Sequence, residues 1–295
     1  MQLFITAIIN GIILGCVYSL VAIGFNMYNG VLRIVNFSHA ATYVFGAYSI
    51  YFFYQHNFGL VLSVVLGVLA TGLLAFLIDR IALLPLRKRK ASGIAGLITT
   101  LGASTVITNF LSADNIFGSD KKPFPALTSI NNFKLGNVTI QGSQILMLVV
   151  SLLSIGILVF IINKTKLGLA MKATQQNVTA ANLMGIDTNK VISITFIICG
   201  IMAGIAAALI NGYYQVISPT MGNMIGMKGF AAAIVGGLDS MFGAITGGWT
   251  VGIVESIAAQ YLGSNVRDPM SFVILIVILL IKPTGFFGKK KVTKI

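Results

Sequence analysis

Side chains that could carry acid–base, nucleophilic or metal chemistry are scarce in this sequence. It has two histidines, two cysteines and a single glutamate, Glu255. Neither a His-Glu-x-x-His zinc motif nor a Gly-x-Ser-x-Gly nucleophile elbow is present, and Cys16 and Cys199 lie far apart within apolar runs. Residues 285–289 have the glycines and lysine of a phosphate loop but lack its four-residue gap and trailing Ser or Thr. We therefore expect no catalytic or metal-binding residue and no cofactor in this chain.

Glu255 lies inside the apolar run 242–262. An ionisable group at that depth in a membrane is costly, so it usually faces the interior of a helix bundle or a water-filled cavity. Glu255 could therefore line a translocation path. Alternatively, it could hydrogen-bond to Ser256, to Gln260 or to a neighbouring helix. The sequence leaves both interpretations open.

A second polar group, formed by Asn36, Ser38 and His39, directly precedes the apolar run 40–54. Ser38 or Asn36 could cap a helix by accepting hydrogen bonds from free backbone N–H groups, and this cap is the simpler interpretation. The alternative is a broken helix end that lines a cavity, where irregular backbone is tolerated in membranes. In that case the three residues would lie with Glu255 along a translocation path.

The composition indicates what kind of elements hold these residues. The chain is 56% hydrophobic and 9% charged, with a mean hydropathy of +0.92, whereas soluble domains carry about 25% charged residues. Apolar runs near the ~18–20 residues that cross a bilayer recur throughout. We predict an all-α, polytopic membrane helix bundle of about eight or nine spans, formed by one domain over residues 1–295.

Nine apolar segments are the candidate spans, roughly 3–28, 40–54, 59–84, 94–111, 144–162, 191–208, 229–238, 242–262 and 271–281. Gly11 and Gly15 in the first have the small-residue spacing that permits close helix packing, and glycines and alanines form a ladder in the eighth. The seventh is about 15 Å long as a helix, too short to cross. We expect it to be half of a broken helix, with Lys228 and Asp239 marking its ends.

Basic residues gather on one side of the predicted bundle. No Lys or Arg precedes Arg33, so the first apolar run is expected to be a retained span, not a signal peptide. Most basic residues then fall on one side, which predicts an outer N-terminus, a cytoplasmic C-terminus and no nucleic-acid partner. The inner set is Arg33, Arg80, Arg87, Lys88, Arg89, Lys90, Lys164, Lys166, Lys172, Lys190, Lys282, Lys289, Lys290, Lys291 and Lys294, and the outer set is Lys121, Lys122, Lys134, Lys228 and Arg267.

Two further segments are assigned from this topology. Asp79 and Arg80 lie at the inner end of the third span and are expected to reach the interface. The polar segment 112–142, with two β-like runs around Phe133 and Val138, is predicted to be an external loop that meets an extracytoplasmic partner.

The polar, basic segment 168–190 interrupts two long apolar runs on the predicted inner side. Its centre, residues 179–185, is compatible with a short helix closed by Gly185. It carries no group typical of catalysis, since its one acidic residue, Asp187, follows the glycine. A small-faced helix between membrane spans is suited to docking on a partner at the membrane surface.

Several motifs recur together and in order along nearly the whole chain. They are Asn10-Gly11-x-x-Leu14-Gly15-x-x-Tyr18-x-Leu20, Asn36-Phe37-Ser38-His39, Gly168-x-Ala170-x-Lys172-Ala173, Leu183-Met184-Gly185-Ile186, Gly226-Met227-Lys228-x-Phe230-x-Ala232-Ala233-x-x-Gly236-Gly237 and Pro283-Thr284-Gly285. In these motifs the chain resembles the LivH-type permease subunits of branched-chain amino acid ABC importers. The resemblance implies a multi-pass protein of the bacterial inner membrane. It also implies a second permease chain, two ATPase subunits that hold ATP and Mg, and an extracytoplasmic substrate-binding protein.

The same resemblance identifies 168–190 as a cytoplasmic coupling loop, whose general pattern is Glu-Ala-Ala-x-x-x-Gly. Ala180, Ala181 and Gly185 are in register, while Thr179 occupies the Glu position and the usual downstream Ile-x-Leu-Pro is absent. The residues expected to couple to an ATPase are Gly168, Lys172, Ala173, Thr179, Ala180, Ala181, Gly185 and Ile186.

Alternative functions remain open at this stage. Related permeases carry urea or short amides, and no residue here selects an aliphatic side chain. An ion-driven secondary carrier is the second class, for which Glu255 and the broken seventh helix would be the evidence. A structural or sensor protein is the third class, although such a protein gains nothing from a polar trio at the end of a span, and an intramembrane enzyme is a further alternative. A carrier needs no docking helix in 168–190, whereas an importer does.

Overall fold

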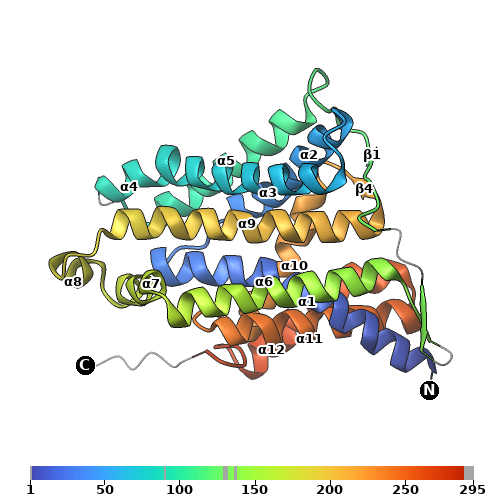
Figure 1. Ribbon diagram of the computed structural model, residues 1–295. Coiled ribbons are helices and arrows are strands. Elements are labelled where there is room, and N and C mark those ends of the chain that lie inside the picture. The colour runs from blue at the N-terminus through green and yellow to red at the C-terminus, as the bar shows by residue number, and fades with distance from the viewer. Residues whose placement is uncertain (1, 90, 129–131, 136–137, 289–295) are drawn as a thin grey trace.

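The computed structural model describes residues 2–89, 91–128, 132–135 and 138–288, and Figure 1 shows their arrangement as a helix bundle. The N-terminal half contains α1 (Gln2–Leu32), α2 (Ser38–Gln55), α3 (Leu60–Leu77), a π-helix (Ile78–Leu83), α4 (Leu84–Lys88), α5 (Gly93–Ser112) and the strands β1 (Lys122–Pro123), β2 (Phe133–Leu135) and β3 (Val138–Ile140). The rest comprises α6 (Gly142–Lys164), α7 (Lys166–Gln176), α8 (Val178–Leu183), α9 (Thr188–Tyr214), β4 (Val216–Ile217), α10 (Met221–Gly236), α11 (Met241–Leu262), a 3₁₀ turn (Ser264–Val266) and α12 (Arg267–Ile281).

Seven helical segments among the described residues are long and apolar enough to cross a membrane. This agrees with a polytopic helical bundle. Two of the expected spans, now α2 and α10, are not among the seven. α2 contains polar residues along its length, and α10 has 16 residues. The number of eight or nine spans and the orientation of the termini therefore stay predictions.

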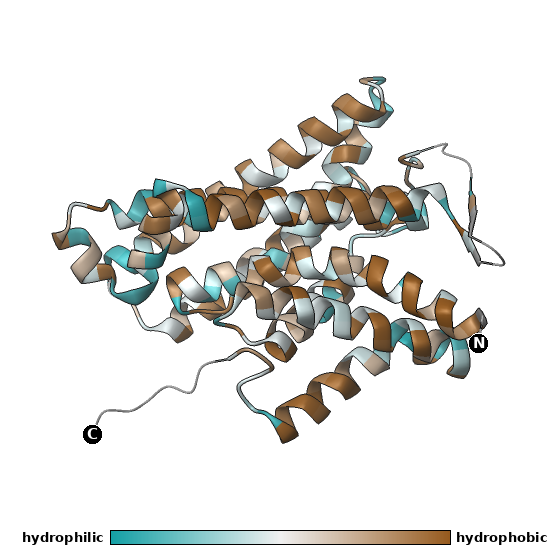
Figure 2. Cartoon of the chain, turned by 60° about the horizontal axis from the view of Figure 1, so that its bottom comes forward, coloured by the Kyte–Doolittle hydropathy of each residue, from teal (hydrophilic) through white to brown (hydrophobic). Residues whose placement is uncertain are grey.

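Burial separates a central set of helices from a peripheral one. In the most apolar stretches of α1 and α9, 78% and 72% of the residues are buried. In those of α5 and of the segment Ser264–Ile281, which contains α12, only 17% and 11% are buried. Peripheral helices expose large apolar side chains such as Val106 and Leu280, and brown, hydrophobic residues cover them in Figure 2. Lipid tails are the solvent in which such surfaces are stable.

The most extensive helix contact joins α1 to α11, and glycine makes it possible. A Cβ added to Gly11 would lie 2.5 Å from the Cα of Ile253, and one added to Gly15 would lie 2.7 Å from the Cα of Trp249. Gly248 of the α11 ladder is equally close, because its Cβ would lie 2.6 Å from the backbone nitrogen of Ser19. The small-residue spacing of the sequence thus predicted close packing correctly, and we call this contact the α1–α11 seam.

The inner end of the third span differs from the expectation. Asp79 does not reach an interface: it is fully buried in the π-helix, where it accepts a hydrogen bond from the Ser193 hydroxyl at 2.6 Å and pairs with Arg87 at 2.5 Å. A buried carboxylate is tolerated only with such partners. Arg80 instead places its guanidinium 5.2 Å from the centre of the Phe76 ring.

The short elements lie at the two ends of the bundle. α7 and α8 lie at the end opposite the N-terminus of α1, while β1 and β4 lie at the N-terminal end (Figure 1). β1 pairs with β4, and β2 pairs with β3, both antiparallel. The two β-like runs around Phe133 and Val138 are therefore confirmed as a strand pair. The basic residues Lys90, Lys289, Lys290, Lys291 and Lys294 lie outside the described residues.

Candidate functional site

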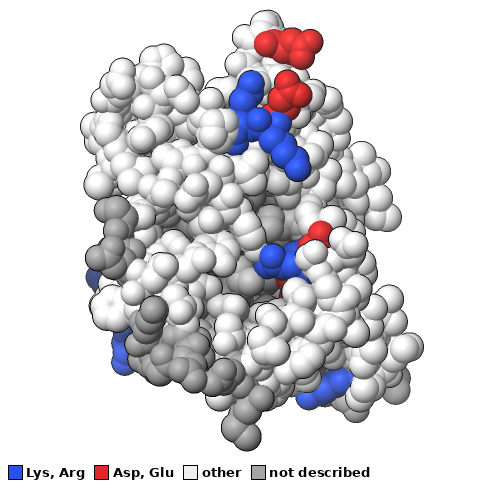
Figure 3. Space-filling view, turned by 90° about the vertical axis from the view of Figure 1, so that its right-hand side faces the viewer, with Lys and Arg blue, Asp and Glu red and all other residues white. Residues whose placement is uncertain are grey.

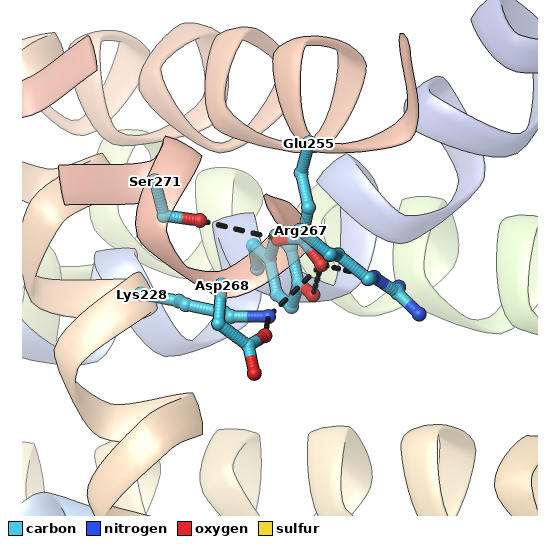
Figure 4. A network of polar contacts seen from close by, with 6 residues as sticks. Lys228, Glu255, Arg267, Asp268 and Ser271 are labelled. Carbon is cyan, nitrogen blue, oxygen red and sulfur yellow. Dashed lines mark hydrogen bonds and ion pairs between the residues drawn. The ribbon is translucent and has the colours of Figure 1, made fainter. Parts of the chain in front are cut away.

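A buried network of charges forms where α1, α10, α11 and α12 meet (Figure 4). The carboxylate of Glu255 is fully buried and accepts hydrogen bonds from the ammonium of Lys228 at 2.9 Å and from the Nε–H of Arg267 at 2.5 Å. The hydroxyls of Tyr18 and Ser271 donate to it at 3.0 and 3.3 Å. Every partner of Glu255 here comes from a neighbouring helix, as one of the two interpretations of the sequence proposed.

Lys228 extends this network towards α12. Its side chain is 4% exposed and also pairs with Asp268 at 2.6 Å. The expectation that Lys228 marks the end of a segment at 229–238 is wrong, because α10 begins at Met221 and carries Lys228 in its middle. A cation can occupy that position because two carboxylates compensate for its lost hydration.

Two turns bring these distant residues together. α10 is followed by Gly237, whose φ of +107° favours glycine. Ser240 then caps α11 by accepting a hydrogen bond from the N–H of Gly243 at 3.1 Å. After α11, Gly263 (φ +98°) reverses the chain into the 3₁₀ turn. Arg267 and Asp268 therefore enter the bundle in the first turn of α12 and face α10 and α11.

The formal charges of the network balance, since Lys228 and Arg267 oppose Glu255 and Asp268. In a low-dielectric interior such a set is stable only when each member keeps its partners. Removal of the fully buried charge, that of Glu255, therefore leaves its cationic partners undercompensated among the helices.

A polar cavity of about 180 Å³ adjoins the network at Arg267. Arg267 is the only ionised side chain among the described residues that line it. The other lining residues are Asn10, Ile13, Leu14, Gln144, Met147, Tyr213, Tyr214, Ser256, Ala259 and Gln260. Seen from the end of the bundle that carries β1 and β4, basic and acidic side chains meet in a hollow near the centre of the face (Figure 3).

The trio Asn36, Ser38 and His39 is buried at the start of α2. The Asn36 side-chain oxygen accepts from the Ser38 N–H at 3.1 Å and from its hydroxyl at 2.6 Å, an arrangement that matches the capping interpretation. His39 lies against the rings of Phe25 and Tyr28, with centroid distances of 5.0 and 5.3 Å. None of the hydrogen bonds among the described residues joins this trio to Glu255.

The segment 168–190 folds into α7 and α8 at the opposite end of the bundle. The side chain of Asn177 caps α8 by accepting from the N–H of Ala180 at 3.0 Å, and Gly185 follows the helix with φ +83°. The short helix closed by glycine is therefore confirmed. Thr179 and Ala180 are exposed, whereas Ala181 is buried against the bundle.

The exposed end of α8 is apolar. Leu183 and Met184 are 83% and 82% exposed, and Gly185 has no atom near the position a Cβ would take. Sequence reasoning favoured the small face of this helix and missed these two large side chains, although a Leu-Met pair before a glycine is a visible signal. Single exposed apolar residues are common on protein surfaces; here two adjacent ones lie at the end of α8, in the hairpin that α7 and α8 form.

The remaining residues assigned to coupling hold the hairpin on the bundle. Gly168 packs on the backbone of Ile162, which leaves no room for a side chain. Lys172 donates to the Asn163 side chain at 2.8 Å. Ala173 and Ile186 are half-buried.

The end of α1 is tied to α7. One terminal nitrogen of Arg33 donates to the backbone oxygens of Gln175 and Gln176, at 3.3 and 3.0 Å. Arg33 has φ +55°, an uncommon conformation for a residue with a side chain. The hairpin and α1 are thus joined by charge-assisted hydrogen bonds.

The sequence is similar to known permease proteins over nearly its whole length. A family model described as "Branched-chain amino acid transport system / permease component" matches residues 7–281. The high-affinity branched-chain amino acid transport system permease protein LivH of Escherichia coli K12 is 32% identical over 99% of this chain and 98% of its own length. BraD of Pseudomonas aeruginosa, described in the same words, is also 32% identical with the same coverage. A probable LivH of Methanocaldococcus jannaschii is 32% identical over 91% of this chain and 88% of its own.

Proposed function

This chain belongs to the family of permease components of branched-chain amino acid transport systems, and from that premise we propose that it is the membrane subunit of an ATP-binding cassette importer for aliphatic amino acids. A second permease chain completes the translocation path. Two ATPase subunits, which hold ATP and Mg, dock on its inner face, and an extracytoplasmic binding protein delivers the substrate.

The exposed hairpin formed by α7 and α8 is the observation that carries this proposal. A permease without a nucleotide site needs a surface through which a separate ATPase can move it. Leu183 and Met184 provide an apolar knob of the kind that seats in a groove on a partner. The proposal assigns Gly168, Lys172, Ala173, Thr179, Ala180, Ala181, Gly185 and Ile186 to this coupling surface, together with the two newly identified residues.

Movement of the hairpin has a direct route into the membrane. A displacement of α7 acts through Arg33 on α1, and α1 acts on α11 through the α1–α11 seam. Glu255 on α11 then moves with the charge network. We propose that alternating access follows this route, with an outer N-terminus, a cytoplasmic C-terminus and residues 112–142 facing the binding protein in the bacterial inner membrane.

Glu255 is proposed to act beside the translocation path, and Asn36, Ser38 and His39 are proposed to support it from α2. The trio stabilises the start of a buried helix, which contributes to the shape of the path without a direct contact to the network. A substrate such as urea or a short amide is the alternative within the family.

Reconstitution of the complete transporter in liposomes tests the proposal. ATP-dependent uptake of leucine that is abolished by Gly185→Trp, with the variant still folded, is the expected result, since Gly185 is exposed beside the knob. An ion-driven carrier is the second candidate, because the buried Glu255 network resembles the ionisable sites of such proteins. Uptake driven by an ion gradient without the ATPases would favour the carrier and refute the importer.

A further inference from the structure

The polar cavity beside Arg267 has the chemistry of a carboxylate site. Arg267 has five N–H donors, and its hydrogen bond to Glu255 uses the one on Nε. Figure 4 shows the guanidinium extending away from that carboxylate, so that its terminal nitrogens point away from the network. The ring of Tyr214 lies against it, with the Cζ atom 5.4 Å from the ring centre. Arg267 and Tyr214 both line the cavity, which places the fork of terminal nitrogens on the cavity side.

The buried network holds this fork in place. Glu255 is satisfied by Lys228, Tyr18 and Ser271 in addition to Arg267. Because the network already balances its own charges, the cavity suits a ligand without net charge. An amino acid zwitterion meets that condition, with its carboxylate on the terminal nitrogens, since two parallel N–H···O bonds are the preferred geometry of an Arg–carboxylate pair.

The rest of the cavity suits the other parts of such a ligand. Gln260 and Ser256 supply oxygens that accept hydrogen bonds from an ammonium group. Ile13, Leu14 and Met147 supply apolar contact for an aliphatic side chain. The volume of about 180 Å³ is far above the ~10–15 Å³ that a single water molecule needs in the same measure, so the cavity has room for a small molecule.

We propose that this cavity binds an aliphatic amino acid during transport, with the α-carboxylate on the terminal nitrogens of Arg267. The proposal rests on the function proposed above and adds the substrate-contacting residue and the point of entry. The cavity lies between the early turns of α1 and the last turns of α11. Its residues therefore lie far from the coupling hairpin, at the end where a delivered substrate would arrive.

Protection of an engineered thiol tests the proposal directly on the purified transporter. Ala259→Cys places a thiol in the wall of the cavity, and the native Cys16 and Cys199 are buried, which keeps background labelling low. Leucine at ten times its Kd is expected to slow maleimide labelling about tenfold, because the free fraction is 1/(1 + [L]/Kd). Leucinamide, which lacks the carboxylate, is expected to give no protection. Tyr261→Cys, on an exposed neighbour outside the cavity, is the control that leucine should not protect.

Arg267→Gln and Arg267→Lys identify the residue responsible. Both are expected to abolish protection by leucine, since glutamine removes the charge and lysine removes the fork. Equal protection by leucinamide, protection that survives in Arg267→Gln, or no protection in the parent Ala259→Cys protein would each overturn the proposal. The comparison of leucine with leucinamide needs no variant at Arg267, so it holds even if those variants fail to fold. ATP-dependent leucine uptake by the wild-type transporter is measured separately. Its absence would refute the importer function, whereas the labelling results test only the site at Arg267.

Discussion

Replacement of Glu255 by glutamine tests whether the buried network holds α10, α11 and α12 together. Glutamine keeps the size of the side chain but removes the charge that faces Lys228 and Arg267, at 2.9 and 2.5 Å. The Lys228 side chain is 4% exposed and that of Arg267 is 24% exposed. Neither cation can recover its full hydration without movement of a helix.

The expected loss of stability follows from these contacts. Removal of one partner of a buried ion pair costs about 3–5 kcal/mol. Lys228 keeps its pair with Asp268 at 2.6 Å, so we place Glu255→Gln at the lower end, about 3 kcal/mol. Because 1 kcal/mol lowers the Tm of a large domain by about 2–4 °C, the Tm should fall by about 6–12 °C.

Thermal unfolding of the purified transporter in detergent measures this change. Asp268→Asn is the matched control: Asp268 is 46% exposed, so its removal should cost less than about 1 kcal/mol. The single variants Glu255→Gln and Lys228→Met each break the Lys228–Glu255 pair, so the loss in the double variant Glu255→Gln/Lys228→Met should be smaller than the sum of the single losses by about 1 kcal/mol or more. A Tm of Glu255→Gln close to that of the wild type, or strictly additive losses, would show that the network does not stabilise the helix contacts.

Three further predictions address other parts of the chain. Leu183→Glu should lower both the copurification of the ATPases and leucine uptake about tenfold or more, as for an interface hot spot. Gln176→Glu, which adds the same charge on the same hairpin, should change neither. Equal effects of the two variants would argue against a docking role for Leu183 and Met184. Gly248→Val should prevent folding, seen as loss of monodisperse protein, because its Cβ would lie 2.6 Å from a backbone nitrogen, whereas Gly156→Val should fold normally, since nothing lies within 4 Å. Asp187 accepts a hydrogen bond from the N–H of Lys190, which lowers the pKa of this carboxyl. The start of α9 should therefore be stabilised above the usual pKa of aspartate and lose that stabilisation as pH falls through the lowered pKa. Protection factors for amide hydrogen exchange at the start of α9 measure this, and factors that stay constant over that pH range would contradict it.

Hydropathy and residue spacing predicted the parts of the fold that local physics determines. The helical bundle, the close glycine packing of α1 and the short helix before Gly185 all follow from apolar run length, small-residue spacing and the conformational freedom of glycine. These features depend on residues within one helix or turn. Their prediction needed no knowledge of which helices are neighbours.

The charge network could not be predicted in the same way, because its members are far apart in sequence. Lys228, Glu255 and Arg267 occupy three helices, and only two glycine-containing turns bring them together. Lys228 next to a short apolar run resembled an end marker, since lysine usually avoids hydrocarbon unless it is paired. Asp79 was misplaced for a similar reason: one of its two partners, Ser193, is 114 residues away in the sequence.

The α1–α11 seam also limits where this protein can change in evolution. At Gly11, Gly15 and Gly248 even one methyl group would meet the backbone of the facing helix. A larger residue at these positions would require α1 and α11 to move apart, which would disturb the whole seam. We therefore expect these three glycines to vary little. Side chains beside the seam that line the cavity, such as Ala259 and Gln260, are not under this limit, so differences in ligand preference are expected at such positions.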